Sequence, residues 1–402
     1  MTEWPTKNPL MKKYLNEVLE NGVWWSREGK FVKEFQHEFS NYLSSEYALC
    51  CSSGTTALET ALKALDIGFG DFVIVPSTTF IGTATSVLKV GALPIFADVE
   101  LATSCISVKS IAALHRKYPN KVKAAIIVHF GGQSCDIDEI IQWSESNQIP
   151  VIEDCAQAIG TYYKDRHVGT FGEIGCFSFQ NTKNLSAGEG GCITTNSRDL
   201  AIKVSKYIDY NFDSIDEDHS FKYVSNNYRL SEFQAAVLLA SFRGGRQHDL
   251  YRITNYDYLN AILSDISDIT VFKHNKEDVR IGCHFFMFRY RTSNTNQPLR
   301  SDLIEHLNKK GVPCFGGYDE LPLNNFAFFK ERHYLENDEF WRTISKQIEI
   351  EYPDSISCPN SELLAKEVIY IPQFVLLRAR DEIDAIKELI VECIETISSY
   401  QS

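Results

Sequence analysis

Short apolar segments alternate with longer amphipathic segments over the first 200 residues. The candidate strands share an unbroken apolar run, and they are Phe72–Val75, Leu93–Val99, Ala124–Phe130, Val151–Glu153, Gly175–Phe179 and Cys192–Thr195. Helical spacing of apolar residues predicts helices at Thr55–Leu65 and Asp136–Glu145. Strands that are apolar throughout and separated by helices are typical of a parallel sheet covered on both faces. The pattern predicts an α/β fold whose mostly parallel sheet binds its ligand at the carboxyl ends of the strands.

A second region begins near residue 246. Its expected elements are an aromatic strand at His284–Tyr290 and helices at Arg252–Leu263, Leu299–Lys310 and Asp381–Ser399. A chain of 402 residues is too long for one small core. We therefore expect a large domain at residues 1–245 and a smaller α+β domain at residues 246–402.

The net charge of −13 disfavours nucleic acid and anionic membranes as partners, because both repel an acidic surface. The segment Met1–Lys13 lacks the apolar stretch of a signal peptide, and no apolar run approaches the ~18 residues of a membrane span. Eleven scattered cysteines without a C-x-x-C pair favour reduced, buried thiols over a disulfide framework or a zinc site. We expect a cytoplasmic protein without a bound metal.

Lys183 follows an apolar run and precedes the glycine cluster Gly188–Gly191. A lysine amine can hold pyridoxal phosphate as a Schiff base, and glycines allow the backbone to approach a ligand closely. The alternative is an ordinary surface lysine. Asp154 ends an apolar strand. A carboxylate facing the ring nitrogen would keep that nitrogen protonated, which makes the ring an electron sink; the alternative is a helix-cap aspartate.

Four more features fit the same cofactor. The turn Ser53–Thr56 opens a predicted helix, whose N–H groups could hold a phosphate, although an ordinary helix cap has the same sequence. Phe80 could lie on the pyridine ring or in the core. Ser178 could donate to the phosphate or be a small strand residue. His129 ends a strand on the predicted ligand side, where it could contact substrate or be structural.

Together these residues resemble the DegT/StrS family of sugar aminotransferases, within the fold-type I group of pyridoxal-phosphate enzymes. The similarity extends over nearly the whole chain, and its motifs are Ser53–Thr56, Pro76–Phe80, Glu153–Gln157, Phe177–Lys183, Gly188–Gly191 and Asn227–Glu232. The resemblance implies that Lys183 is the Schiff-base lysine and Asp154 the partner of the ring nitrogen. It also implies a homodimer with shared active sites, in which Asn227 reaches the phosphate of the neighbouring subunit. The remaining cofactor contacts that it implies are Gly54, Thr55, Thr56, Phe80, Gln157 and Ser178.

Finer motifs resemble the 3-amino-5-hydroxybenzoate synthase and scyllo-inosose aminotransferase branch. These motifs are Glu3–Pro5, Gly22–Trp25, Phe179–Asn181 and Gly311–Tyr318. The branch implies transfer of an amino group from glutamine or glutamate to a keto-cyclitol or keto-sugar without a nucleotide, in amino-sugar or antibiotic biosynthesis. The candidate substrate contacts are Trp25, His129, Arg229 and Tyr318. Each could instead be structural, in an interface, a strand end, a helix-end ion pair or the small-domain core respectively.

Three alternatives remain. The acceptor could be a nucleotide-linked keto-sugar, although the members that use such sugars tend to carry a Tyr-x-Pro-Leu-His pattern where this chain has the segment Tyr318–Leu323. The chain could be a pyridoxal-phosphate-binding regulatory protein without catalysis. It could also be a lyase or dehydratase on the same fold, but the dehydratases of the family carry histidine in place of the lysine.

Overall fold

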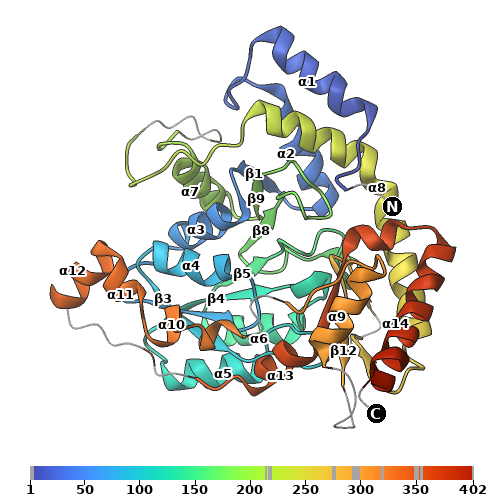
Figure 1. The fold of residues 1–402 in the computed structure, drawn as a ribbon. Coiled ribbons are helices and arrows are strands. Elements are labelled where there is room, and N and C mark those ends of the chain that lie inside the picture. The colour runs from blue at the N-terminus through green and yellow to red at the C-terminus, as the bar shows by residue number, and fades with distance from the viewer. Residues whose placement is uncertain are drawn as a thin grey trace.

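The computed structural model describes residues 4–212, 215, 220–273, 278–291, 299–317, 321–347, 353 and 356–400. Within these residues the centre is a seven-stranded sheet with the strand order β1-β9-β8-β5-β4-β2-β3 (Figure 1). Its strands are β1 (Tyr47–Cys51), β2 (Phe72–Pro76), β3 (Leu93–Ala97), β4 (Val122–Val128), β5 (Val151–Asp154), β8 (Ile174–Ser178) and β9 (Gly191–Thr195). The pairs from β3 to β8 are parallel, whereas β9 is antiparallel to β8 and to β1. The predicted mostly parallel sheet is confirmed, and β1 is an edge strand that the apolar pattern did not reveal.

Helices cover both faces of this sheet. The buried apolar residues of α3 (Gly54–Ala64), α4 (Ile81–Lys89), α5 (Val108–Lys117) and α7 (Arg198–Ile208) belong to one core, together with Ile140 and Trp143 of α6 (Ile137–Asn147). Those of α1 (Pro9–Asn21), α2 (Lys30–Leu43) and the first half of α8 (Glu232–Leu263) belong to another. Neighbouring residues of β1 face opposite cores, since Cys51 lies in the first and Cys50 in the second.

Helix α8 begins at Glu232, 20 residues before the predicted helix Arg252–Leu263, and both end at Leu263. It begins at a capping box in which Ser231 and Gln234 bond to each other's backbone N–H groups. The glycines at 244 and 245 do not end it. A Cβ at Gly244 would lie 2.8 Å from Nδ2 of Asn8, so the glycine lets the start of α1 pack closely against α8. The predicted domain boundary between 245 and 246 falls inside this helix, and the division remains a prediction.

The C-terminal part of the chain forms a second, smaller sheet. It is antiparallel and contains β10 (Ile269–Val271), β12 (Phe285–Tyr290) and β13 (Val368–Pro372). Its core also includes the second half of α8, α9 (Arg300–Lys309) and α14 (Arg380–Tyr400). A small ribbon is formed by β6 (Tyr162–Tyr163), β7 (Arg166–His167) and β11 (Val279–Arg280).

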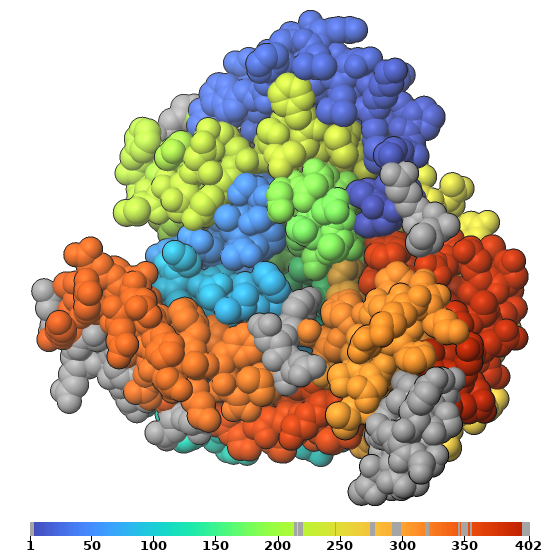
Figure 2. Space-filling model, in the orientation of Figure 1, coloured from blue at the N-terminus to red at the C-terminus, as the bar shows by residue number. Residues whose placement is uncertain are grey.

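The segment between β12 and β13, two strands of the second sheet, packs against the first sheet. It contains α10 (Ala327–Lys330), α11 (Tyr334–Asn337), α12 (Glu339–Gln347) and α13 (Pro359–Glu367). Phe329 and Trp341 belong to the same core as the first sheet. Figure 2 shows the C-terminal third of the chain, orange to red, spread across the lower part of the molecule below the blue N-terminal helices. The short 3-10 helices are η1 (Phe130–Gly132), η2 (Leu323–Asn325) and η3 (Gln373–Leu377).

All eleven cysteines lie within the described residues, and each is buried and free of a disulfide, which confirms the expected reduced thiols. Across the described part of the chain, no helix is both long and apolar enough to cross a bilayer.

Candidate active site

A cavity of about 490 Å³ opens where the parallel strands end and helix α3 begins. It lies at the edge of the sheet where the sequence predicted a ligand. The side chains and backbone that line it are those of Ser53, Gly54, Thr55, Leu58, Thr79, Phe80, Gly82, Thr83, Val128, Asp154, Ala156, Gln157, Ser178, Gln180, Thr182, Lys183 and Glu189. Seven predicted cofactor residues therefore meet in one cavity: Gly54, Thr55, Phe80, Asp154, Gln157, Ser178 and Lys183.

Lys183 lies on a turn after β8 in which its N–H donates to the carbonyl of Gln180 at 2.9 Å. Its half-buried side chain forms part of the cavity wall. Burial lowers the pKa of Lys183 to about 8, although the negative charge of Asp154 opposes this change. Near neutral pH an appreciable fraction of the amine is therefore uncharged, as a nucleophile or a general base requires.

Asp154 ends β5 with its carboxylate held by two donors. Oδ2 accepts a hydrogen bond from the hydroxyl of Thr83 at 2.9 Å, and Oδ1 accepts one from the N–H of Ala156 at 3.1 Å. Burial raises the pKa of Asp154, while these two donors and the charge of Lys183 lower it. The carboxylate is thus fixed in direction at the cavity wall, where it can face a positively charged group.

The amino end of α3 forms another wall. Ser53 caps the helix by accepting the N–H of Thr56 at 3.1 Å, and the hydroxyl of Thr56 donates to the carbonyl of Ser53 at 2.9 Å. The side chain of Thr56 therefore completes the cap and does not line the cavity. A Cβ at Gly54 would lie 2.8 Å from Cβ of Ser178, so only glycine lets the helix end approach β8 this closely. Backbone N–H groups at such a helix end suit an anion.

These residues fit pyridoxal phosphate. The end of α3 with Thr55 and Ser178 suits the phosphate, Asp154 suits a protonated ring nitrogen, and Lys183 supplies the amine. Phe80 is half-exposed at the cavity, where its ring could cover the cofactor ring. The side chain of Gln157 is oriented by the N–H of Gly131, which donates to its Oε1 at 2.7 Å.

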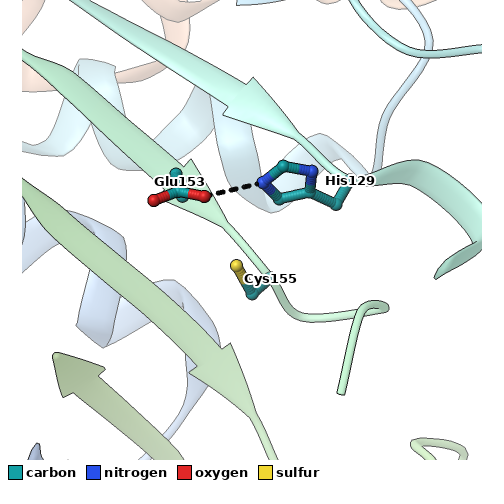
Figure 3. A group of neighbouring side chains, drawn as sticks. All are labelled: His129, Glu153 and Cys155. Carbon is teal, nitrogen blue, oxygen red and sulfur yellow. Dashed lines mark hydrogen bonds and ion pairs between the residues drawn. The ribbon is translucent and has the colours of Figure 1, made fainter. Parts of the chain in front are cut away.

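His129 does not line the cavity, in contrast to the prediction that it contacts substrate. It is fully buried, and Figure 3 shows its ring pointing toward Glu153 on the neighbouring strand. Its Nδ1 accepts the N–H of Cys135 at 3.2 Å, so the proton is on Nε2, which donates to Oε2 of Glu153 at 3.0 Å. Both nitrogens are used inside the protein. The structure assigns His129 a structural role.

Glu153, His129 and Cys155 are the kinds of residue that bind metals, and they lie together (Figure 3). However, the carboxylate of Glu153 also accepts three backbone N–H groups, those of Gly169, Phe171 and Gly172, at 2.7 to 2.8 Å. Burial opposes ionisation, but the hydrogen bond from His129 and those from the backbone donors lower the pKa of Glu153. Glu153 therefore holds the turn at 169–172 against β5, and its buried carboxylate has hydrogen-bond donors from the backbone and from His129.

The other predicted contacts lie away from the cavity. Arg229 forms an ion pair with Asp209, which also binds Arg27, so the ion-pair alternative for Arg229 is the one observed. Trp25 is 44% exposed, with the guanidinium of Arg27 4.6 Å from its ring centre. Asn227 is exposed and its backbone pairs with that of Asp209. Roles for these residues in substrate binding or in a neighbouring subunit remain predictions, and Tyr318 lies outside the described residues.

Sequence reasoning missed several residues of the cavity wall. Thr83 orients Asp154 from helix α4, three residues after Phe80. Gln180 and Thr182 flank the turn of Lys183, and Glu189 lies inside the glycine cluster. Their positions beside recognised motifs were the available signal, because all of them fall within a few residues of a predicted contact.

Residues 6–390 match the DegT/DnrJ/EryC1/StrS aminotransferase family. The chain belongs to this family. GDP-perosamine synthase of Escherichia coli O157:H7 is 31% identical over 334 residues, which are 83% of this chain and 89% of that protein. L-glutamine:2-deoxy-scyllo-inosose aminotransferase of Micromonospora echinospora is 36% identical over 59% of each chain. The crystal structure of 3-amino-5-hydroxybenzoic acid synthase covers 98% of both chains, with a TM-score of 0.84 and 26% identity.

Family membership confirms the predictions of an enzyme and of an aminotransferase. The cofactor of this aminotransferase is pyridoxal phosphate, in agreement with the residues that line the cavity. The structural match confirms the expected fold class.

Proposed function

We propose that this aminotransferase moves an amino group from glutamine or glutamate to the carbonyl carbon of a keto-cyclitol or keto-sugar that carries no nucleotide. The observation that carries the proposal is the charge of the cavity. Among its described lining residues, Lys183 is the single cation, whereas Asp154 and Glu189 are acids. A diphosphate would meet repulsion and no second cation here, whereas an uncharged ring with several hydroxyl groups would meet Gln180, Thr182 and Glu189 as polar partners.

When bound, the cofactor supplies a conjugated ring that accepts the electron pair left when a proton is removed from carbon. Nζ of Lys183 moves that proton, because its lowered pKa leaves neutral base available near neutral pH. Asp154 provides a fixed negative charge beside the ring, held in direction by Thr83 and Ala156. The amino end of α3 and Ser178 would hold the phosphate and so position the cofactor for Lys183.

The comparisons support both the donor and a cyclic acceptor. The inosose aminotransferase that resembles this chain uses L-glutamine according to its name. Similarity to GDP-perosamine synthase over a larger share of the chain favours a second candidate, a nucleotide-linked keto-sugar as acceptor. We also infer a homodimer with shared sites, in which the exposed Asn227 faces the neighbouring subunit. The eleven free cysteines support a cytoplasmic location.

Two measurements test the proposal. Glutamine or glutamate alone should convert the yellow cofactor-loaded enzyme to its colourless aminated form, and borohydride should fix the cofactor to Lys183 in the native chain but not in Lys183→Ala. A regulatory protein without catalysis, or a lyase, would show no such conversion with any common amino acid.

The aminated enzyme is then offered scyllo-inosose, free keto-sugars and nucleotide-linked keto-sugars in parallel. We expect rapid return of the yellow form with an acceptor that lacks a nucleotide. Glu189→Gln serves as a probe of the wall, because removing the negative charge should improve the weak reaction with nucleotide-linked sugars. Return of the colour with nucleotide-linked sugars alone would reject the proposed acceptor and leave the aminotransferase activity intact.

A further inference from the structure

Asn184 directly follows Lys183, and both ends of its side-chain amide are bonded to a distant part of the chain. Its Nδ2 donates to the carbonyl of Gly282 at 2.6 Å, and its Oδ1 lies 3.1 Å from Nδ1 of His284. Because the amide nitrogen is used by a carbonyl, Oδ1 is the acceptor and Nδ1 of His284 must carry the proton. The segment just before strand β12 thus holds the residue next to the reactive lysine.

The backbone of His284 is itself fixed at both ends. Its N–H donates to the carbonyl of Gly131 at 3.0 Å, and its carbonyl accepts the N–H of Gln373 at 3.1 Å. A Cβ at Gly132, where φ is +92°, would lie 2.9 Å from the nitrogen of His284. Only glycine permits this contact, so the start of β12 sits directly on the loop that follows β4. The imidazole is therefore presented to Asn184 from a rigid support.

Burial and the positive charges nearby keep the ring of His284 neutral. The side chain is 2% exposed, and burial together with the positive charges of Lys183 and Arg252 holds the pKa of His284 well below its ordinary value. Arg252 is 1% exposed and donates through Nε to Oε1 of Gln373 at 2.7 Å. Lys183 also faces the carboxylate of Asp154. The amine of Lys183 is thus within electrostatic reach of an imidazole that takes no direct part in the chemistry.

We propose that His284 and Asn184 are positioning residues, which clamp the turn of Lys183 to the C-terminal sheet and hold its amine where the surrounding protein desolvates it. Without the clamp, the turn moves outward and water reaches the amine. The desolvation that lowers the pKa of Lys183 is then lost, and this pKa returns toward its ordinary value of 10.5. The proposal requires only the aminotransferase chemistry of Lys183 and does not depend on the acceptor.

The test compares His284→Ala and Asn184→Ala with the native chain. In the cofactor-free full chain, reductive methylation of Lys183 at a series of pH values is read by peptide mass spectrometry, since only the neutral amine reacts. In the cofactor-loaded enzyme, the visible absorption is titrated over the same range. We expect the midpoint of methylation to rise by about one pH unit or more, and the midpoint of the absorption titration to move by a similar amount. In the half-reaction with the amino donor alone, we also expect the limiting rate constant to fall more strongly than the donor concentration for half-maximal rate changes.

Two conservative variants keep the test decisive if an alanine variant does not fold. In His284→Asn, the new amide nitrogen takes the position of Nδ1 and can donate to Asn184, so this variant should have the native midpoints. In His284→Gln, the new amide nitrogen takes the position of Nε2 and cannot reach Asn184, so the midpoints should be shifted.

Asn255→Ala is the matched control. Asn255 is also buried, and its Nδ2 donates to the carbonyls of Leu376 and Arg378 at 2.9 and 3.0 Å, so it ties α8 to the segment after β13 and not to the turn of Lys183. This variant should lower the Tm and leave both midpoints unchanged. Native midpoints in a folded His284→Ala or His284→Gln protein would overturn the proposal, and so would an equal shift in Asn255→Ala. No acceptor is used, so failure of the acceptor screen would not affect the result.

Discussion

Substitution of Gly54 by alanine should damage cofactor binding through a single contact. The new Cβ would lie 2.8 Å from Cβ of Ser178, whereas ordinary contacts begin near 3.4 Å. The end of α3 and strand β8 must therefore separate by about 0.6 Å. Neither partner is the flexible end of a long side chain, so the backbone has to move, which costs about 1–3 kcal/mol of stability.

The same movement displaces the N–H groups that the helix end offers to the phosphate. A hydrogen bond to a charged group contributes about 1.5–3 kcal/mol, so weakening the equivalent of one such bond reduces affinity by roughly 10-fold or more. The dissociation constant is measured by titrating cofactor-free protein with pyridoxal phosphate and following fluorescence quenching. Thermal unfolding of the cofactor-free protein separately reports the cost of the contact.

Two variants isolate the cause. At Gly68 the nearest atom to an added Cβ is 4.0 Å away, so Gly68→Ala should bind the cofactor as the native chain does. Ser178→Gly removes the clashing Cβ, and Gly54→Ala in that background should cause no further loss of affinity. The reasoning is refuted if Gly54→Ala alone binds within twofold of the native chain, or if the double variant is much weaker than Ser178→Gly.

Glu153→Ala should lower the free energy of unfolding by about 3–5 kcal/mol in urea titrations, because one buried and two part-buried N–H groups and the buried ring of His129 lose their acceptor; a loss below about 1 kcal/mol would contradict the network. Since the pKa of Glu153 is lowered on folding, its stabilisation is present above the unfolded pKa and disappears as pH falls through the folded one. Acid unfolding of Glu153→Gln should accordingly be shallower than that of the native chain. The rate of cofactor capture by cofactor-free protein should rise with pH through a midpoint near 8, since the neutral amine of Lys183 reacts; a midpoint near 10 would argue against a buried amine. Mixed dimers of Lys183→Ala and Asn227→Ala chains should regain activity if Asn227 serves the neighbouring site, and a monomer in sedimentation would exclude this arrangement.

Much of the fold could be read from local patterns. Each of the six predicted strands overlaps an observed strand of the first sheet, because unbroken apolar runs of this length can be buried on both faces only in a covered sheet. Strand β1 was not predicted, because the segment Tyr47–Cys51 follows helix α2 closely and its antiparallel partner β9 lies about 140 residues later in the chain. The continuity of α8 was missed because glycines usually mark helix ends, whereas Gly244 is retained where Asn8 packs against the helix.

The sequence by itself determined the chemistry of the cavity. Asp154 ends one apolar strand and Lys183 follows another on a turn, and parallel strands bring their carboxyl ends to one edge whatever the details of packing. The direction of each side chain could be decided only by tertiary structure. Val128 lines the cavity and His129, the next residue, points into the protein. Neighbouring positions near a strand end face opposite sides, and which side holds the ligand depends on the packing of the whole sheet. The contact of Asn184 with His284, 100 residues later in the chain, likewise exists only because the two sheets meet beside the reactive lysine.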